Sequence, residues 1–202
     1  MGKVGGGLRY RAPPLIRDAR GAMDAWPIAI RIMMIDFLPL AQFPVSDVEA
    51  LLDRAFGPGR HQRTAYLIRG ETAAIDALSV AAVEHGALVG TIQCWPVALT
   101  DDTGAAHPMV MIGPVAVAPE RQRDGIGRML MTHALLAAHT EGLDEAMMLI
   151  GDPEYYGRFF GFDASRTAGW RLPGPVERHR LLAKGANVPA APGALHAAPA
   201  MA

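Results

Sequence analysis

The length, composition and charge of the chain already exclude several classes of protein. With 202 residues, it fits one domain of ordinary size with a substantial core. Half of the residues are hydrophobic and 19% are charged, which excludes a wholly disordered chain. The net charge of −1 gives no general reason to expect nucleic acid as a partner. No apolar run reaches the roughly 18 residues that a membrane span requires, so we expect no membrane partner.

Cysteine and histidine usage point to a reducing compartment and to no metal site. Cys94 is the single cysteine, so no internal disulfide can form. The histidines lack the spacing of metal ligands. No compact apolar segment with a small-residue cleavage site opens the chain, so we expect no signal peptide and a cytoplasmic location.

Both ends of the chain are predicted to be extensions of a central domain. Residues 1–33 combine a glycine run, a Pro-Pro pair and scattered arginines, and we expect a flexible N-terminal extension. Residues 185–202 are an Ala/Pro-rich tail without periodicity, which we expect to be at least partly disordered. The folded domain is therefore expected over residues 34–184.

The first half of this domain is predicted to alternate short strands and helices. Ser46-Asp-Val-Glu49 matches a capping box and predicts a helix start at Ser46. Gly57 is expected to end that helix. A second short helix is predicted over 61–69, and strands over 35–40, 78–84 and 88–99, the last two joined by a tight hairpin at 85–87.

The second half is predicted to contain a strand–turn–helix–strand unit. A strand over 109–118 leads into a glycine turn and a helix that ends at Gly142. The strand over 146–150 follows by a right-handed crossover and should be parallel to the strand before it. Asp152 is expected to cap a short helix ending at Gly161, with a strand starting at Phe162. An edge strand is predicted over 170–175; residues 177–184 fit either a strand or a short helix.

The glycine turn has the properties of an anion site. Gln122-Arg-Asp-Gly125-Ile-Gly127 places free N–H groups at a helix start, where the helix dipole also favours negative charge. A dinucleotide fingerprint is disfavoured because Leu130 stands where its third glycine would be. A P-loop is excluded because the chain has no Gly-Lys-Ser/Thr sequence.

Two motifs resemble the GNAT superfamily of N-acetyltransferases, in particular its YhbS-like bacterial subgroup. The first is a strand, then Gln122-x-x-Gly125-x-Gly127, then a helix. The second is Gly151-Asp-Pro-Glu-Tyr155-Tyr156-Gly-Arg158-Phe, followed by Gly161-Phe162. This chain has two aromatic residues, Phe159 and Phe160, between Arg158 and the Gly-Phe pair, where the subgroup usually has one. The resemblance covers roughly residues 35 to 184.

The resemblance implies an α/β (α+β) fold with a mixed, mainly antiparallel sheet that splays at the cofactor, and acetyl-CoA as the co-substrate. The strand before the glycine turn would pair with the pantetheine arm, with Gly113-Pro114 marking a bulge that opens the sheet. Backbone amides of the turn would hold the pyrophosphate, with Arg121, Arg123 or Arg128 adding charge. The implied cofactor-binding residues are Val115, Ala116, Val117, Gln122, Arg123, Asp124, Gly125, Ile126, Gly127 and Arg128.

The resemblance also implies a tyrosine that protonates the leaving thiolate. Tyr156 is the first candidate, counted from the helix start at Asp152, and Tyr155 is the second. Packing in a core is the alternative interpretation of both. Glu84, Glu120 and His107 are candidate general bases near strand ends, and a water chain is an equal alternative. Cys94 lies in an apolar strand and is expected to be inert.

The predicted function is direct transfer of an acetyl group to a primary amine of a small molecule or peptide. The resemblance also allows a homodimer. The rival hypothesis is a non-catalytic acyl-CoA-binding or sensor protein with the same fold. Transfer to a protein N-terminus or lysine is a third.

Overall fold

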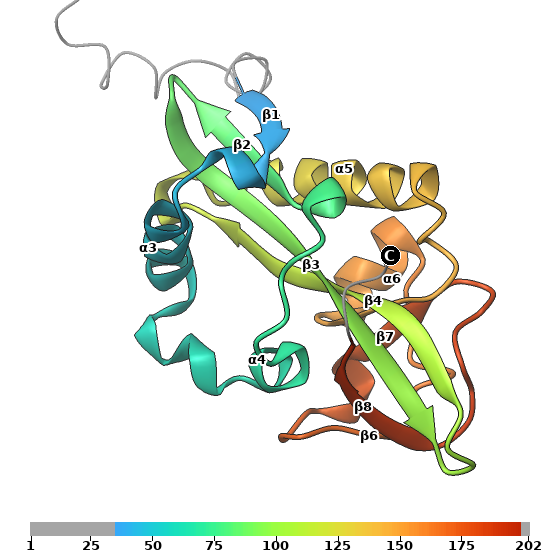
Figure 1. Cartoon of the computed structure of the whole chain (residues 1–202). Coiled ribbons are helices and arrows are strands. Elements are labelled where there is room, and N and C mark those ends of the chain that lie inside the picture. Colours follow the sequence, from blue (N-terminus) through green and yellow to red (C-terminus); the bar gives the residue numbers. More distant parts are fainter. Residues whose placement is uncertain (1–34, 199–202) are drawn as a thin grey trace, which may run out of the picture.

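The computed structural model describes residues 35–198, which form an eight-stranded sheet flanked by helices (Figure 1). The predicted extension over residues 1–33 lies outside the described residues. Six strands follow the order β1-β2-β3-β4-β5-β7, and β8 pairs with β3 and with β6. Their bounds are β1 Ile35–Pro39, β2 Val80–Glu84, β3 Ala87–Asp101, β4 Ala106–Val117, β5 Met147–Ile150, β6 Trp170–Arg171, β7 Leu181–Lys184 and β8 Gly193–Ala197.

The sheet is mainly antiparallel and opens between β4 and β5. The β4–β5 pair is parallel, as predicted for a right-handed crossover. Its register contains two residue pairs, Val110 with Met147 and Met111 with Met148. Beyond Met111, β4 continues to Val117 along β3, while β5 continues along β7. The two strands therefore diverge, and the sheet splays as expected for a mixed α/β (α+β) fold of this kind.

A bulge in β4 lies at the point of divergence. In β3, Ile92 pairs with Val115 and Cys94 pairs with Ile112, so two residues of β4, Gly113 and Pro114, lie opposite one residue of β3. The predicted bulge at Gly113-Pro114 is confirmed. Gly113 has φ 118°, a value that side-chain-bearing residues rarely adopt, which explains glycine at this position.

Helices cover both faces of the sheet (Figure 1). α5 (Ile126–Thr140) packs on one face, in a core that includes Ala82 of β2 and Ile92 of β3. α3 (Val45–Phe56) packs on the opposite face with Ala81, which points away from its neighbour Ala82. The short α6 (Pro153–Phe160) joins the α5 side, and the short α4 (Thr64–Arg69) contacts β3 and β8.

Most predicted elements are confirmed within one to three residues at each end. The β2–β3 hairpin has positive φ at His85 and Gly86, as a tight two-residue turn requires. Asp152 caps α6, because its Oδ1 accepts a hydrogen bond of 2.9 Å from the Glu154 N–H. Residues 177–184, which the sequence left undecided, contain both a 3₁₀ turn (Arg178–Arg180) and β7.

Three local predictions are wrong. α3 begins at Val45 after Pro44, and the Ser46 hydroxyl donates to Asp47, so the capping box does not form. No extended strand starts at Phe162; Asp163 makes an isolated bridge with Ala183. The tail after Gly185 was expected to be partly disordered, but residues 193–197 form β8, because β3 is long enough to pair with it beyond the end of β2.

Candidate functional site

The glycine turn forms the start of α5. Gly125 is the N-cap in the left-handed region (φ 82°), and no side chain caps the helix. The N–H groups of Ile126 and Gly127 have no carbonyl acceptor within residues 35–198. A Cβ on Gly127 would lie 3.7 Å from Val117 and 3.8 Å from Val115, so the helix start packs directly against β4. The turn therefore presents N–H groups beside the diverging strand.

The charged residues of the turn divide into anchors and exposed side chains. Arg121 is buried and donates to Glu84 and, at 2.8 Å, to Asp124. Arg121 therefore fixes the turn to the end of β2, and its predicted contribution to anion binding is not supported. Arg123 and Arg128 are exposed, as is Gln122. The Arg128 guanidinium lies 5.2 Å from the Phe159 ring of α6, facing α6 across the splay.

The edge of β4 after the bulge has no partner strand on its β5 side among the described residues. Val115, Ala116 and Val117 pair with β3 through their other edge. The Val115 and Val117 side chains face the α5 core, whereas Ala116 is buried against the α3 core. The three predicted cofactor-binding residues of the strand thus lie together on an open edge that continues into the glycine turn.

A cavity of about 990 Å³ lies where the sheet splays. One wall is the bulge of β4, and the other is the end of β5 with the first turn of α6. Residues from α4 and the segment before it close the cavity from the α3 side, and residues 175–177 with Arg180 complete it. The lining set includes Tyr66, Arg69, Gly113, Pro114, Val115, Ile150, Gly151, Asp152, Tyr156 and Glu177.

Tyr156 lines this cavity, and its position depends on Gly151. A Cβ on Gly151 would lie 2.3 Å from the Tyr156 ring, so only glycine leaves room for the ring there. Burial raises the pKa of Tyr156 to about 12, Tyr155 and Asp152 act in the same direction, and the positive charge of Arg180 opposes the shift. The phenol therefore keeps its proton over the whole physiological pH range.

Tyr155 points elsewhere. It packs in an aromatic group with Tyr156, Phe159 and Phe160 and does not line the cavity. Burial raises the pKa of Tyr155 as well, while the nearby Arg128 opposes the shift. Of the two predicted tyrosines, the structure brings Tyr156 to the cavity wall and leaves Tyr155 among the aromatic side chains of α6.

None of the three candidate bases lines the cavity. Glu84 is paired with Arg121 at the glycine turn. Glu120 accepts hydrogen bonds from Arg54 on the molecular surface. His107 lies at the far end of the β3–β4 hairpin, 2.9 Å from Asp101. All three side chains are engaged outside the cavity, so the structure gives no support for a general-base role of any of them.

Cys94 is fully buried in β3, and burial raises the pKa of its thiol to about 12. A thiol in this environment stays protonated and unreactive, as predicted.

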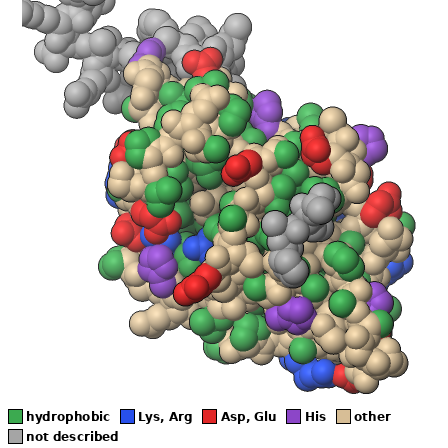
Figure 2. All heavy atoms as spheres, in the orientation of Figure 1, with side chains coloured by type: hydrophobic (Ala, Val, Ile, Leu, Met, Phe, Trp, Pro, Cys, Tyr) green, Lys and Arg blue, Asp and Glu red, His purple; other side chains and the backbone are tan. Residues whose placement is uncertain are grey.

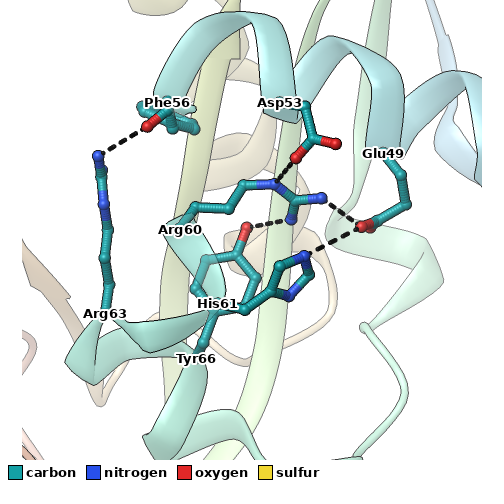
Figure 3. Close-up of polar contacts among 7 residues, drawn as sticks. All are labelled: Glu49, Asp53, Phe56, Arg60, His61, Arg63 and Tyr66. Atoms are coloured by element: carbon teal, nitrogen blue, oxygen red, sulfur yellow. Dashed lines mark hydrogen bonds and ion pairs between the residues drawn. The ribbon is translucent and has the colours of Figure 1, made fainter. Parts of the chain in front are cut away.

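No local pattern in the sequence predicted the cluster that Arg60 forms with Glu49, Asp53 and Tyr66. Figure 3 shows Arg60 pointing toward Asp53 and Glu49 of α3 and toward Tyr66 of α4. The Arg60 side chain is 1% exposed; its Nε donates to Asp53 at 2.7 Å and its Nη1 to the Tyr66 hydroxyl at 2.6 Å. Burial opposes the charge, but the hydrogen bonds to Glu49, Tyr66 and Asp53 outweigh it and raise the pKa of Arg60.

The sequence also missed Arg69, the last residue of α4, which a sequence argument would treat as a cation at a helix C-terminus. Its guanidinium lies 4.0 Å from the Tyr66 ring centroid and 4.0 Å from the Trp95 ring centroid. In Figure 2, acidic, basic and histidine side chains lie next to one another over α3 and the segment that follows it.

Comparison with known proteins identifies the family. The profile of the Acetyltransferase (GNAT) family matches residues 45–162, more than half of the chain. The chain therefore belongs to the GNAT acetyltransferase family. An uncharacterized N-acetyltransferase of Streptomyces avermitilis is 25% identical over 141 residues, which make up 70% of this chain and 34% of that protein. The chain thus spans about a third of the length of this relative.

Solved structures agree at the level of the fold. The GNAT family N-acetyltransferase YhbS of Escherichia coli, crystallised in complex with CoA, is 20% identical, with a TM-score of 0.58 over 81% of this chain and 88% of that one. This likeness shows that the two proteins share a fold. A GNAT family acetyltransferase of Brucella melitensis in complex with acetyl-CoA is 25% identical, covers 76% and 97% of the two chains, and has a TM-score of 0.46, too low for a structural argument.

Among the helices of residues 35–198, none is long and apolar enough to cross a membrane. In the same part of the chain, no group of three or more His, Cys, Asp or Glu side chains is arranged to hold a metal ion.

Proposed function

We propose that this protein is an acetyl-CoA-dependent N-acetyltransferase that moves an acetyl group directly to a primary amine of a small molecule or peptide. The observation that carries the proposal is the splay between β4 and β5. An open strand edge and the half-buried Tyr156 line one cavity at this splay, and the same strand edge continues to the helix start with its free N–H groups.

The residues present fit acetyl-CoA. The open edge of β4 at Val115, Ala116 and Val117 offers backbone N–H and C=O groups to the amides of the pantetheine arm. Within the turn from Gln122 to Arg128, the N–H groups of Ile126 and Gly127 offer donors to the pyrophosphate, because Gly125 and Gly127 leave the backbone accessible. The exposed Arg123 and Arg128 add positive charge to that end of the site.

Bound acetyl-CoA would supply the acetyl thioester; the contribution of the chain is to hold the reactants and to manage protons. Tyr156 holds a phenolic proton at the cavity wall, and we propose that it donates this proton to the leaving sulfur. A backbone N–H of β4 next to the bulge would hydrogen-bond the carbonyl oxygen of the thioester. No residue is assigned as the base that takes the proton of the incoming ammonium.

The test of the proposal has a binding arm and a turnover arm. A thermal shift with acetyl-CoA tests the cofactor, and release of free thiol on a panel of primary amines tests transfer. We expect both responses. Binding without thiol release would favour the acyl-CoA sensor, and the absence of any shift at millimolar acetyl-CoA would contradict both functions.

Two variants assign the roles. Tyr156→Phe should lower kcat about 100-fold or more and leave the Kd of acetyl-CoA nearly unchanged, because only the acidic proton is lost. Tyr155→Phe is the matched control, since Tyr155 lies outside the cavity lining. Gly125→Val should raise the Kd of acetyl-CoA, because a branched residue is strained at φ 82° and would distort the turn. A Tyr156→Phe variant with full turnover would remove Tyr156 from the mechanism.

A further inference from the structure

Arg69 is a charged side chain in the cavity wall that has no charged or hydrogen-bonding partner within residues 35–198. Its Nη1 is buried and donates no hydrogen bond there. No carboxylate of these residues lies within ion-pair distance of it. The rings of Tyr66 and Trp95 pack on the guanidinium and give its N–H groups no in-plane acceptor. Native proteins rarely leave a buried charged donor unsatisfied, so this group calls for a ligand.

The position of Arg69 is at the acetyl end of the site. Trp95, on which Arg69 packs, donates a hydrogen bond of 2.8 Å from Nε1 to the carbonyl oxygen of Gly113 in the β4 bulge. The cavity that Arg69 lines also contains Tyr156 but none of the residues 122–128 of the glycine turn. The free donors of Arg69 therefore face the region where an acceptor would meet the acetyl group, away from the predicted pyrophosphate position.

The carboxylates of the cavity already have partners. Asp152 accepts the Glu154 N–H at 2.9 Å as the cap of α6, and Glu177 lies 3.5 Å from His179. Three arginines line the cavity, Arg63, Arg69 and Arg180, against these two carboxylates. The Arg63 guanidinium donates to the Phe56 carbonyl at 3.1 Å. The balance of charge and the unsatisfied donors both favour an anionic group near Arg69.

We propose that Arg69 binds the carboxylate of the acceptor, so that the substrate class is amines that also carry a carboxylate, such as α-amino acids. The inference rests on the proposed function and names its acceptor. A guanidinium held between two rings presents a planar fork of donors, which matches the planar carboxylate in a two-point hydrogen bond. The burial that lowers the pKa of Arg69 makes such a bond stronger than it would be in water.

Matched pairs of acceptors test the substrate class on the full chain. Thiol release is measured with phenylalanine against phenethylamine and with 4-aminobutyrate against propylamine, so that each pair differs in the carboxylate. We expect a kcat/KM at least 10-fold higher for the carboxylate-bearing member of one pair, because one charge-assisted contact is gained. Equal or better turnover of both bare amines overturns the proposal.

Variants at Arg69 test the residue. Arg69→Met should lower kcat/KM for the carboxylate-bearing amine about 100-fold, mostly through KM, and leave the value for the bare amine unchanged. Arg69→Lys should recover part of the loss, because it keeps the charge without the fork. Arg171→Met is the matched control, since Arg171 pairs with Asp102 on the surface outside the cavity lining. An equal loss with both amines overturns the proposal, since Arg69 would then act on the acetyl group or on the fold.

A binding measurement separates this proposal from the proposed function. Calorimetry in the presence of CoA compares N-acetylphenylalanine with N-acetylphenethylamine, for the parent chain and for Arg69→Met. We expect the carboxylate-bearing ligand to bind at least 10-fold more tightly to the parent chain and this advantage to vanish in the variant. CoA binding without any carboxylate preference overturns the role of Arg69 alone, whereas a chain that binds no CoA contradicts the proposed function.

Discussion

Arg60 and Arg69 lie near the same aromatic ring, that of Tyr66, yet their surroundings are opposite. Arg60 has two carboxylates and a hydroxyl around its guanidinium, and all three of its nitrogens donate hydrogen bonds. Arg69 has two aromatic rings and a buried Nη1 without an acceptor within residues 35–198. The pKa of Arg60 is raised and the pKa of Arg69 is lowered.

The difference separates a structural charge from one that is available to a ligand. Arg60 ties the segment after α3 to α3 itself and to α4, through bonds within the chain (Figure 3). Arg69 contributes no such bond and lines the cavity. Because removal of Arg60 would leave its partners without a donor, we expect that substitution to cost more stability than the removal of Arg69.

The largest effect is expected from Arg60→Met, which removes the partnered arginine. The change leaves Glu49 and Asp53 facing each other without the cation and takes a donor from Tyr66, so the free energy of unfolding should fall by about 3 kcal/mol. Urea denaturation measures this value. A loss below about 1 kcal/mol would show that the hydrogen bonds of Arg60 contribute little to stability. Arg60 and Arg69 would then not differ in their effect on the free energy of unfolding.

A second effect concerns Tyr156, whose phenol lines the cavity. Burial raises its folded-state pKa from 10.0 to about 12, so the unfolded chain ionises first as the pH rises. The free energy of unfolding should therefore fall between about pH 10 and pH 12. The fall should be smaller in Tyr156→Phe, and identical slopes in both proteins would contradict the burial of the phenol.

Tyr66→Phe sharpens the comparison, because it removes the hydroxyl that Arg60 uses and keeps the ring on which Arg69 packs. One hydrogen bond to a charged group is lost, so the free energy of unfolding should fall by about 1 to 2 kcal/mol. Denaturation midpoints of Tyr66→Phe and Arg60→Met are compared directly. If Tyr66→Phe lost as much as Arg60→Met, the hydrogen bond to Tyr66 would account for the whole contribution of Arg60 to the free energy of unfolding.

The smallest effect on stability is expected from Arg69→Met. The substitution removes a half-buried charge whose Nη1 has no acceptor and keeps an unbranched side chain on the two rings, so the free energy of unfolding should change by less than about 1 kcal/mol in either direction. The same denaturation series provides the measurement. A loss comparable to that of Arg60→Met would mean that Arg69 also stabilises the fold. A loss of carboxylate binding in Arg69→Met could then result from the destabilised fold.

Local patterns in the sequence were sufficient to predict the helices and turns that surround the site. The strand–turn–helix unit around Gly125 and the capped helix after Asp152 depend on backbone rules that act within a few residues, and both are confirmed. The bulge at Gly113-Pro114 could be predicted because glycine and proline mark such interruptions. The capping box at Ser46 was wrong because the helix begins one residue earlier, at Val45, so Ser46 lies inside the first turn and not at its cap.

Long-range contacts explain what the sequence did not reveal. The tail became β8 because β3 extends past β2 and leaves an edge to which residues 193–197 can pair, a fact that no local pattern records. The candidate bases Glu84 and Glu120 were plausible by their places at strand ends, but partners distant in the sequence, Arg121 and Arg54, engage them.

The sequence by itself determined the strand–turn–helix unit and the residues of the glycine turn, because these follow from spacing along the backbone. The family and the mixed α/β sheet followed from the resemblance that two motifs carry. Only the tertiary structure decided which tyrosine of the Tyr155-Tyr156 pair faces the cavity, since that depends on the room left over Gly151. It also decided which arginine is free for a ligand. Arg60 and Arg69 are equivalent in a sequence, and they differ because burial and partner atoms are assigned only when α3, α4 and β3 pack together.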